Sequence, residues 1–392
     1  MKRFVLARVV ISTCVLMLLT ASACRSSEAD VVGTPVTQAP HVDKPKLQVA
    51  LLGATQGESM FSAQHAMEGA RLAFDLANQA GGLPVDVIAV AGDTMEDSSV
   101  VTGQVSEAAG DPSYVGIVAW TSSPESPALA AAAAAGGLPV VSVSPVAGAG
   151  TPDGFWSRMV APDRVLAESV AHLMAASAGR RPVCVTADNG PRGLDLVRWV
   201  TSALASRGVE AGFTQTVAAE QSDYVDLVGN IADAHCALVF WGGGTTEGGL
   251  IRAEMTEAGL PEAVMIGVDT LVAGPFATAA GPAGEGTIAA CACTDVSTST
   301  SLDAQEFIQG YQSKYGNPPS AFAVEGWDAA QRIIAAVDAG NVDRATIGRF
   351  LSEQRQFAGL GSSYVFDAQG ESANSGVYLY ELREGTWTSA SS

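Results

Sequence analysis

Residues 114–145 have the pattern of a strand, a turn, a helix and a second strand. The stretch begins with the apolar run VGIVAW, which is typical of a strand buried on both faces of a parallel sheet. ALAAAAAA is the strongest helix-forming run in the chain, and the GG after it favours the end of that helix. LPVVSVS then returns as a second buried strand. The whole stretch therefore predicts a parallel crossover.

The turn of this crossover, TSSPESP, places Thr121, Ser122 and Ser123 at the start of the predicted helix. Free backbone N–H groups and the positive end of the helix dipole would face outward there, beside three hydroxyls. Such a turn is suited to binding a carboxylate or another small anion. The alternative is that the serines only cap the helix.

The chain has 392 residues, of which 47% are hydrophobic, so it is long enough for two lobes. Its formal net charge is −20, and loss of the basic N-terminal leader (Lys2, Arg3 and Arg8) would lower it by three, to −23. This acidity argues against nucleic acid or an anionic membrane surface as a partner. It favours an exported, monomeric protein.

The N-terminus has the pattern of an export signal: a basic start, an apolar middle (VVISTCVLMLL) and small residues before Cys24. The sequence ASAC resembles a bacterial lipobox, although Ala21 stands where leucine is usual. We therefore expect residues 1–23 to be a lipoprotein signal peptide and Cys24 to carry the lipid that anchors the chain to the outer face of the cell membrane. An ordinary signal peptide cleaved after ASA is the alternative. Residues 24–45 are polar and aperiodic, which predicts a disordered tether.

From residue 46 onward, predicted strands and helices alternate at short spacing. KLQVALLGA is a strand, QGESMFSAQ a loop, AMEGARLAFDLANQA an amphipathic helix, VDVIAVAGD a second strand and residues 95–109 a second helix. This alternation predicts an α/β fold with parallel sheets, helices on both faces and binding at the C-terminal ends of the strands.

In this order, the chain resembles a type I periplasmic substrate-binding protein of the branch that binds leucine, isoleucine and valine for ABC importers. The segments that carry the resemblance are VALLGATQG, MEGARLAFDLANQAGGL, YVGIVAWTSS, LPVVSVSP, KYGNPPSAFAVEGWDAAQRIIAAV and YVFDAQGES. The resemblance implies two doubly wound parallel-sheet lobes joined by three hinge crossovers. The first lobe would comprise residues 46–161 and 292–375, and the second lobe residues 162–291 and 376–388.

The resemblance also implies a ligand site between the lobes. Two first-lobe loops would hold the α-carboxylate of the ligand through hydroxyls and backbone N–H groups. The residues concerned are Thr121, Ser122, Ser123, Ser144 and Ala147. In the second lobe, Asp269 matches the acid that family members offer to the α-ammonium, with a helix cap as the alternative interpretation.

The chain departs from the family pattern where second-lobe tyrosines are usual, because Arg192 stands at one such place and Gly244 or Thr245 at the other. Phe61 lies where the first-lobe loop often offers an aromatic ring. The exchange of tyrosine for Arg192 suggests a more polar or acidic ligand, unless Arg192 is a solvated rim residue. We interpret Trp120 and Trp241, at strand ends, as core residues rather than ligand platforms.

Four cysteines remain beyond Cys24, namely Cys184, Cys236, Cys291 and Cys293. Cys184 and Cys236 begin neighbouring strands, so a bridge is conceivable, but we expect buried free thiols. Cys291 and Cys293 are two residues apart on a predicted strand and are expected to be poorly placed to bond each other. The four histidines are scattered, and we expect no metal and no cofactor.

No nucleophile elbow, phosphate-binding loop or zinc motif is present in the sequence, so we do not expect an enzyme or catalytic residues. The first hypothesis is a lipid-anchored receptor that captures an amino-acid-like molecule and delivers it to ABC permease subunits. The second is a ligand-sensing receptor on the same fold without a transport role. The third is an enzyme or a surface protein that has lost ligand binding.

Overall fold

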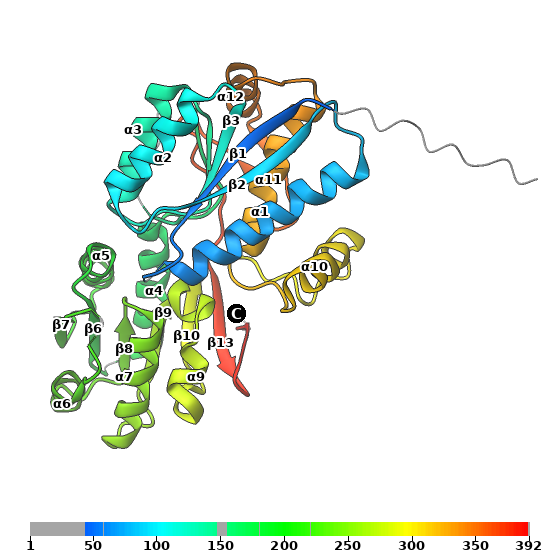
Figure 1. The fold of residues 1–392 in the computed structure, drawn as a ribbon. Coiled ribbons are helices and arrows are strands. Elements are labelled where there is room, and N and C mark those ends of the chain that lie inside the picture. Colours follow the sequence, from blue (N-terminus) through cyan, green and yellow to red (C-terminus); the bar gives the residue numbers. More distant parts are fainter. Residues whose placement is uncertain (1–43, 58, 147–154, 180, 220, 391–392) are drawn as a thin grey trace, which may run out of the picture. The chain divides into compact units, whose positions relative to one another are not determined.

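Two parallel-stranded sheets form the framework of the chain (Figure 1). The computed structural model describes residues 44–57, 59–146, 155–179, 181–219 and 221–390. The predicted signal peptide, Cys24, nearly all of the tether and Ala147 lie outside these residues. Within the described ranges, no helix is both long and apolar enough to cross a membrane.

The first sheet has the strand order β2-β1-β3-β4-β5, and all of its pairings are parallel. Its strands are β1 (Lys46–Gly53), β2 (Asp86–Asp93), β3 (Tyr114–Ala119), β4 (Val140–Ser142) and β5 (Trp156–Arg158). The helices packed with it are α1 (Met60–Ala80), α2 (Ser98–Gly110), α3 (Glu125–Gly136), α10 (Leu302–Tyr315), α11 (Ala323–Asp338) and α12 (Arg344–Glu353).

Both faces of this sheet are buried, as the apolar strands predict. Val49 and Leu51 of β1 pack in one core with α1 and α11, whereas Ala50 and Leu52 pack in another with α2 and α3. Figure 1 shows these two helix pairs on opposite faces. Helices α1 and α11 approach so closely that a Cβ on Gly69 would lie 1.9 Å from the Ala323 carbonyl oxygen.

The second sheet has the order β14-β13-β10-β9-β8-β6-β7, in which β13 pairs antiparallel with β10 and β14. Its strands are β6 (Val183–Asp188), β7 (Phe213–Val217), β8 (Leu238–Trp241), β9 (Val264–Val268), β10 (Ile288–Cys291), β13 (Tyr378–Arg383) and β14 (Thr386–Ser389). Helices α4 (Asp163–Ala178) and α5 (Pro191–Ser206) pack in one of its cores. The other core contains α6 (Val225–Asp233), α7 (Thr245–Glu257), α8 (Asp269–Ala273) and α9 (Phe276–Ala280).

The fold therefore confirms the α/β class with two lobes. The chain leaves the first sheet after β5, returns after β10 to the first lobe as helices α10, α11 and α12, and enters the second sheet again at β13. A 3-10 helix (Gly281–Gly284) precedes β10, and a small hairpin of β11 (Gln356–Ala358) and β12 (Ser363–Val365) follows α12. The lobe boundaries 46–161 with 292–375 and 162–291 with 376–388 stay a prediction.

Two helix starts differ from the sequence-based expectation. Helix α1 begins at Met60 rather than after a loop through residue 64, because Ser59 is held by a hydrogen bond from its N–H to Glu96 Oε1 (2.8 Å). Helix α2 begins at Ser98 rather than residue 95. Met95 and Glu96 take left-handed conformations (φ 54° and 53°), and the Asp97 side chain caps the helix instead.

The expectation of free thiols is wrong. Cys184 forms a disulfide with Cys236, with their Cα atoms 5.8 Å apart. Cys291 forms a disulfide with Cys293, with their Cα atoms 5.1 Å apart. A two-residue step along an extended strand covers about 6.6 Å. Because β10 ends at Cys291 and the backbone bends there, the second pair comes within bonding distance.

Candidate functional site

Polar residues gather at the C-terminal ends of the parallel strands in both lobes. In the first lobe Thr121 follows β3 and Ser144 follows β4, and both are fully buried. Thr121 Oγ1 lies 2.7 Å from Ser126 Oγ, and the Ser144 hydroxyl donates to the Thr121 carbonyl (2.6 Å). The structure thus brings the two predicted loops together, but these two hydroxyls already have partners within the first lobe.

The turn before α3 is closed by Ser122 backbone groups and the Glu125 side chain, and no side chain caps the helix. The Ser122 N–H donates to Glu125 Oε2 (2.7 Å), while the Ser122 carbonyl accepts from the N–H groups of Glu125 and Ser126 (both 3.1 Å). The interpretation that the serines cap this helix is therefore wrong, because no serine hydroxyl does so, but the Ser122 N–H is bound to Glu125 and is not free for an anion. The Ser122 hydroxyl is buried and has no hydrogen-bond partner among the described residues, and Ser123 is half-buried.

Arg158 and Glu125 were not found by sequence reasoning. Arg158 is 1% exposed, donates through Nη1 to the carbonyls of Ser144 and Val146, and forms an ion pair with Glu371 (2.7 Å). It therefore fixes the start of the loop that contains Ala147. An arginine inside a buried strand (WSR) was the available signal, because a buried charge needs partners.

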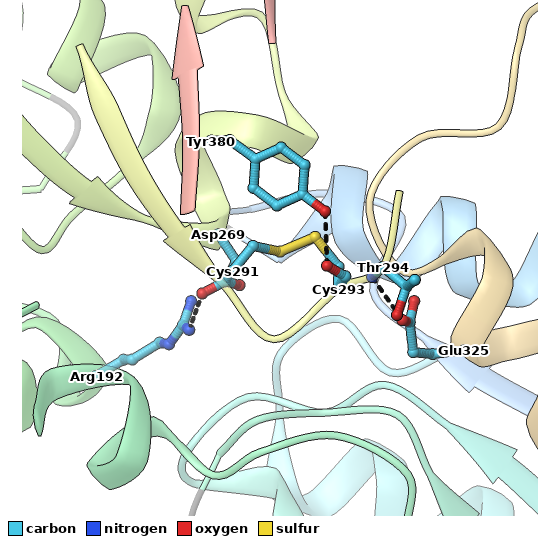
Figure 2. The surroundings of a disulfide bond; sticks show 7 residues. All are labelled: Arg192, Asp269, Cys291, Cys293, Thr294, Glu325 and Tyr380. Carbon is cyan, nitrogen blue, oxygen red and sulfur yellow. Dashed lines mark hydrogen bonds and ion pairs between the residues drawn. A yellow bond between two sulfur atoms is a disulfide. The ribbon is translucent and has the colours of Figure 1, made fainter. Parts of the chain in front are cut away.

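In the second lobe, one arginine joins two aspartates. Arg192 lies at the start of α5, Asp163 at the start of α4 and Asp269 directly after β9. Arg192 donates through Nε to Asp163 Oδ2 (3.0 Å) and through Nη2 to Asp163 Oδ1 (2.7 Å). It also donates through Nη2 to Asp269 Oδ1 (2.6 Å), as Figure 2 shows. We call these three residues the Arg192 triad.

The Arg192 triad is almost entirely removed from water. The two aspartates are 1% and 0% exposed and the arginine side chain 11%, so the alternative of a solvated rim residue is wrong. Burial raises the pKa of Asp269, and Arg192 offsets part of this rise. Burial by itself would lower the pKa of Arg192, but the two carboxylates outweigh it and raise that pKa. Asp163 was missed because a helix-start aspartate is commonly only a cap.

Thr245 and Phe61 come together around one glycine. A Cβ on Gly274 would lie 2.5 Å from Thr245 Cγ2 and 3.0 Å from Phe61 Cδ2. Thr245 is 7% exposed, and its buried hydroxyl has no partner among the described residues. Trp120 and Trp241 are 3% and 0% exposed, which confirms their interpretation as core residues.

The Cys291–Cys293 disulfide lies in the segment that leads from β10 to the first lobe (Figure 2). The Tyr380 hydroxyl donates to the Cys293 carbonyl (2.8 Å), and the next N–H, that of Thr294, donates to Glu325 Oε1 (2.7 Å). Burial raises the pKa of Glu325 to about 7. This crossover is therefore fixed from both sides. Within the described ranges, no group of three or more His, Cys, Asp or Glu residues could hold a metal ion.

Comparisons with known proteins agree with this architecture. The family model described as "Periplasmic binding protein" matches residues 46–386. The "Leu/Ile/Val-binding protein homolog 2" of Brucella abortus is 26% identical over 204 residues, which are 52% of this chain and 54% of the relative. The match therefore spans about half the length of that relative.

Two solved structures show the same fold. The branched-chain amino acid binding protein LivJ of Streptococcus pneumoniae, in complex with isoleucine, has a TM-score of 0.78 at 17% identity and covers 88% of this chain and 100% of that one. A solute-binding protein of R. palustris, in complex with benzoate, has a TM-score of 0.73 at 21% identity and covers 88% of this chain and 95% of that one.

Proposed function

Because the chain belongs to the periplasmic binding protein family, we propose that it is the extracytoplasmic solute-binding lipoprotein of an ABC importer. It captures an amino acid or a similar small polar molecule and delivers it to ABC permease subunits. The observation that carries this proposal is the family match over residues 46–386, combined with polar side chains at the C-terminal strand ends of both sheets. The chain acts as a monomer, without catalysis, and is anchored through lipid on Cys24.

In this proposal the ligand contacts both lobes. The first lobe contributes hydroxyls and backbone groups, and the second lobe contributes the residues around the Arg192 triad. The proposed contact residues are Phe61, Thr121, Ser122, Ser123, Ser144, Ala147, Arg192, Thr245 and Asp269. Two of their hydroxyls, those of Ser122 and Thr245, are buried without a described partner and are suited to receive a ligand.

Capture occurs by closure of the two lobes about the three crossovers. A ligand that contacts both lobes binds the closed form better than the open form and shifts the population toward it. The two structural neighbours bind isoleucine and benzoate, so the fold accepts both amino acids and organic acids. The ligand of this chain is therefore sought among both classes.

The experiment is a thermal-shift screen of the purified protein against amino acids, organic acids, amides, short peptides and polyamines. A micromolar ligand at millimolar concentration should stabilise the protein by roughly 4 kcal/mol. A hit supports solute binding, and permease and ATPase genes beside this gene support import. No response to any solute would contradict the proposal, whereas a neighbouring kinase or regulator gene would favour a sensor.

A further inference from the structure

In the Arg192 triad, the carboxylate expected to bind a ligand ammonium, that of Asp269, is already bound to a cation of the protein, Arg192. We propose that Arg192 is a specificity-determining residue, which selects a ligand with a carbonyl or carboxylate oxygen and no ammonium group. This inference rests on the proposed function and narrows its ligand to small organic acids and amides.

The first support is position. Arg192, Asp163 and Asp269 each lie at the start of a helix or directly after a strand, at the strand ends where open α/β sheets bind ligands. The Asp163 N–H donates to the Pro145 carbonyl (2.6 Å), so the triad adjoins the loop that begins at Ser144 in the first lobe. A ligand at this edge therefore meets the triad.

The second support is the pattern of donors. Nε and Nη2 of Arg192 are engaged by the two aspartates, whereas Nη1 has no hydrogen bond to a described residue. The Arg192 side chain is 11% exposed. A guanidinium only donates hydrogen bonds, so a ligand that binds Nη1 must offer an acceptor. Ligand carbonyl and carboxylate groups supply one.

The third support is the burial and hydrogen bonding of Asp269. An α-ammonium would need a free, accessible carboxylate, but Asp269 is 0% exposed and its Oδ1 is bound to Arg192. Its Oδ2 has no described partner, yet it is buried beneath the same surface. An ammonium bound to Asp269 would lie beside the guanidinium that already occupies Oδ1, which places two cations side by side.

Three other acids lie near the C-terminal strand ends, and two of them, Asp188 and Glu125, accept hydrogen bonds from backbone N–H groups. Asp188 Oδ1, at the end of β6, accepts the Gly190 N–H (2.8 Å), and burial raises the pKa of Asp188. Glu247, in the first turn of α7, is close to Gly244. A Cβ added to Gly244 would lie 2.2 Å from Glu247 Oε2. In the first lobe, Glu125 is bound to the Ser122 N–H.

The test compares matched triplets of ligands on the wild-type protein by calorimetry. Each triplet contains an amino acid, its des-amino acid and the corresponding amide: leucine, 4-methylpentanoate and 4-methylpentanamide; phenylalanine, 3-phenylpropanoate and 3-phenylpropanamide; glutamate, glutarate and glutaramide. We expect the acid or the amide of at least one triplet to bind at least tenfold more tightly than the amino acid. Comparing the affinities for the acid and the amide shows whether the protein recognises a carboxylate or an amide carbonyl.

Variants of the triad test whether Arg192 causes the preference for the acid or the amide. The double variant Arg192→Gln/Asp269→Asn removes one positive and one negative charge, so it keeps the net charge of the triad while losing the guanidinium. We expect at least a tenfold loss of affinity for the preferred acid or amide. The matched control is Arg198→Gln on the same helix, whose side chain is 67% exposed and should leave affinity unchanged.

The outcomes separate the two proposals. Tenfold preference of the wild-type protein for an amino acid over its analogues overturns the inference and leaves the proposed function standing. Equal binding within a triplet, or affinity within twofold in the double variant, also overturns the inference. No binding of any triplet, together with silence in the wider solute screen, overturns both.

Discussion

Two of the regions in which the protein buries carboxylates stabilise them differently. In the Arg192 triad, Asp163 and Asp269 face a guanidinium. On α11, Glu325 and Asp328 are 2% and 0% exposed, but their partners are backbone N–H groups and a tyrosine hydroxyl. Within the described residues no salt bridge reaches either α11 acid.

This difference determines how each region responds to a change of pH and to the loss of a cation. A carboxylate that only accepts hydrogen bonds keeps most of its desolvation cost, and burial raises the pKa of Glu325 to about 7 and of Asp328 to about 6. A carboxylate beside a guanidinium can stay ionised in the interior, but it then depends on that one cation. The stability that the α11 acids contribute should therefore depend mainly on pH, whereas that of the triad should depend most strongly on Arg192.

The largest expected effect is that of Arg192→Ala, which leaves two buried carboxylates without a cation. Breaking a buried ion pair in this way costs about 3–5 kcal/mol. Urea denaturation of the ligand-free protein measures it. Arg198→Ala, on the same helix but in an exposed pair with Asp195, should cost less than about 1 kcal/mol. Equal losses in the two variants would mean that the triad is not a buried ion cluster.

The second effect is a pH dependence that comes from Glu325. Its pKa is about 7 in the folded protein and about 4.3 in an unfolded chain, so its neutral form favours the folded state. The resulting stability is present below pH 4.3 and is lost as the pH rises through 7. The loss is roughly 3 kcal/mol by pH 8.

Glu325→Gln keeps an oxygen for the Thr294 N–H and removes the ionisation. The free energy of unfolding of the variant should therefore rise relative to the wild type between pH 5 and pH 8. Unfolding curves at a series of pH values measure this difference. The exposed Glu353, replaced by glutamine, is the control and should give a curve parallel to the wild type. Parallel curves for Glu325→Gln would contradict the raised pKa.

The third effect concerns Tyr364, whose hydroxyl donates to Asp328 Oδ2 (2.9 Å) and which is 2% exposed. Tyr364→Phe removes a hydrogen bond to a charged group and should cost about 1.5–3 kcal/mol at pH 8. The cost should shrink at pH 5, because Asp328 is protonated below its pKa of about 6. Tyr378→Phe, at a 40% exposed tyrosine, is the control. A cost that does not change with pH would show that Asp328 keeps one charge state.

The fold could be predicted from the sequence because its signals are local and repeated. Apolar runs such as VGIVAW, and glycines after helices, marked the elements and their order. Helix starts were less accurate, since Ser59 is held by Glu96, a residue far along the chain whose side chain gives no local signal.

The positions of the candidate site residues could be predicted from the sequence, but their contacts could not, because these contacts join segments distant in sequence. Thr121, Ser144, Arg192 and Asp269 could be placed at strand ends, but their partners could not. That Arg192 would join Asp163 to Asp269 depends on three elements distant in sequence, α4, α5 and the end of β9. The Cys291–Cys293 bond depends on a bend directly after β10, and the assumption of an extended strand excluded it.

The smallest expected effect is that of Asp269→Asn, the partner of the pair that Arg192→Ala breaks. The triad holds two acids and one base, and Arg192 keeps both of its hydrogen bonds to Asp163 when Asp269 is neutral. Asparagine retains an Oδ1 for Arg192 Nη2, so the variant should change stability by about 1 kcal/mol, well below the loss in Arg192→Ala.

The sign of its pH dependence is also fixed by the triad. Burial raises the pKa of Asp269, so the stability that its neutral form contributes is lost as the pH rises through that pKa. Asp269→Asn, which cannot ionise, should therefore gain stability relative to the wild type as the pH rises through the Asp269 pKa, measured by urea denaturation at a series of pH values beside Arg192→Ala. If the asparagine variant were as unstable as the alanine variant, the contact between Asp269 and Arg192, rather than the two bonds to Asp163, would hold the triad together.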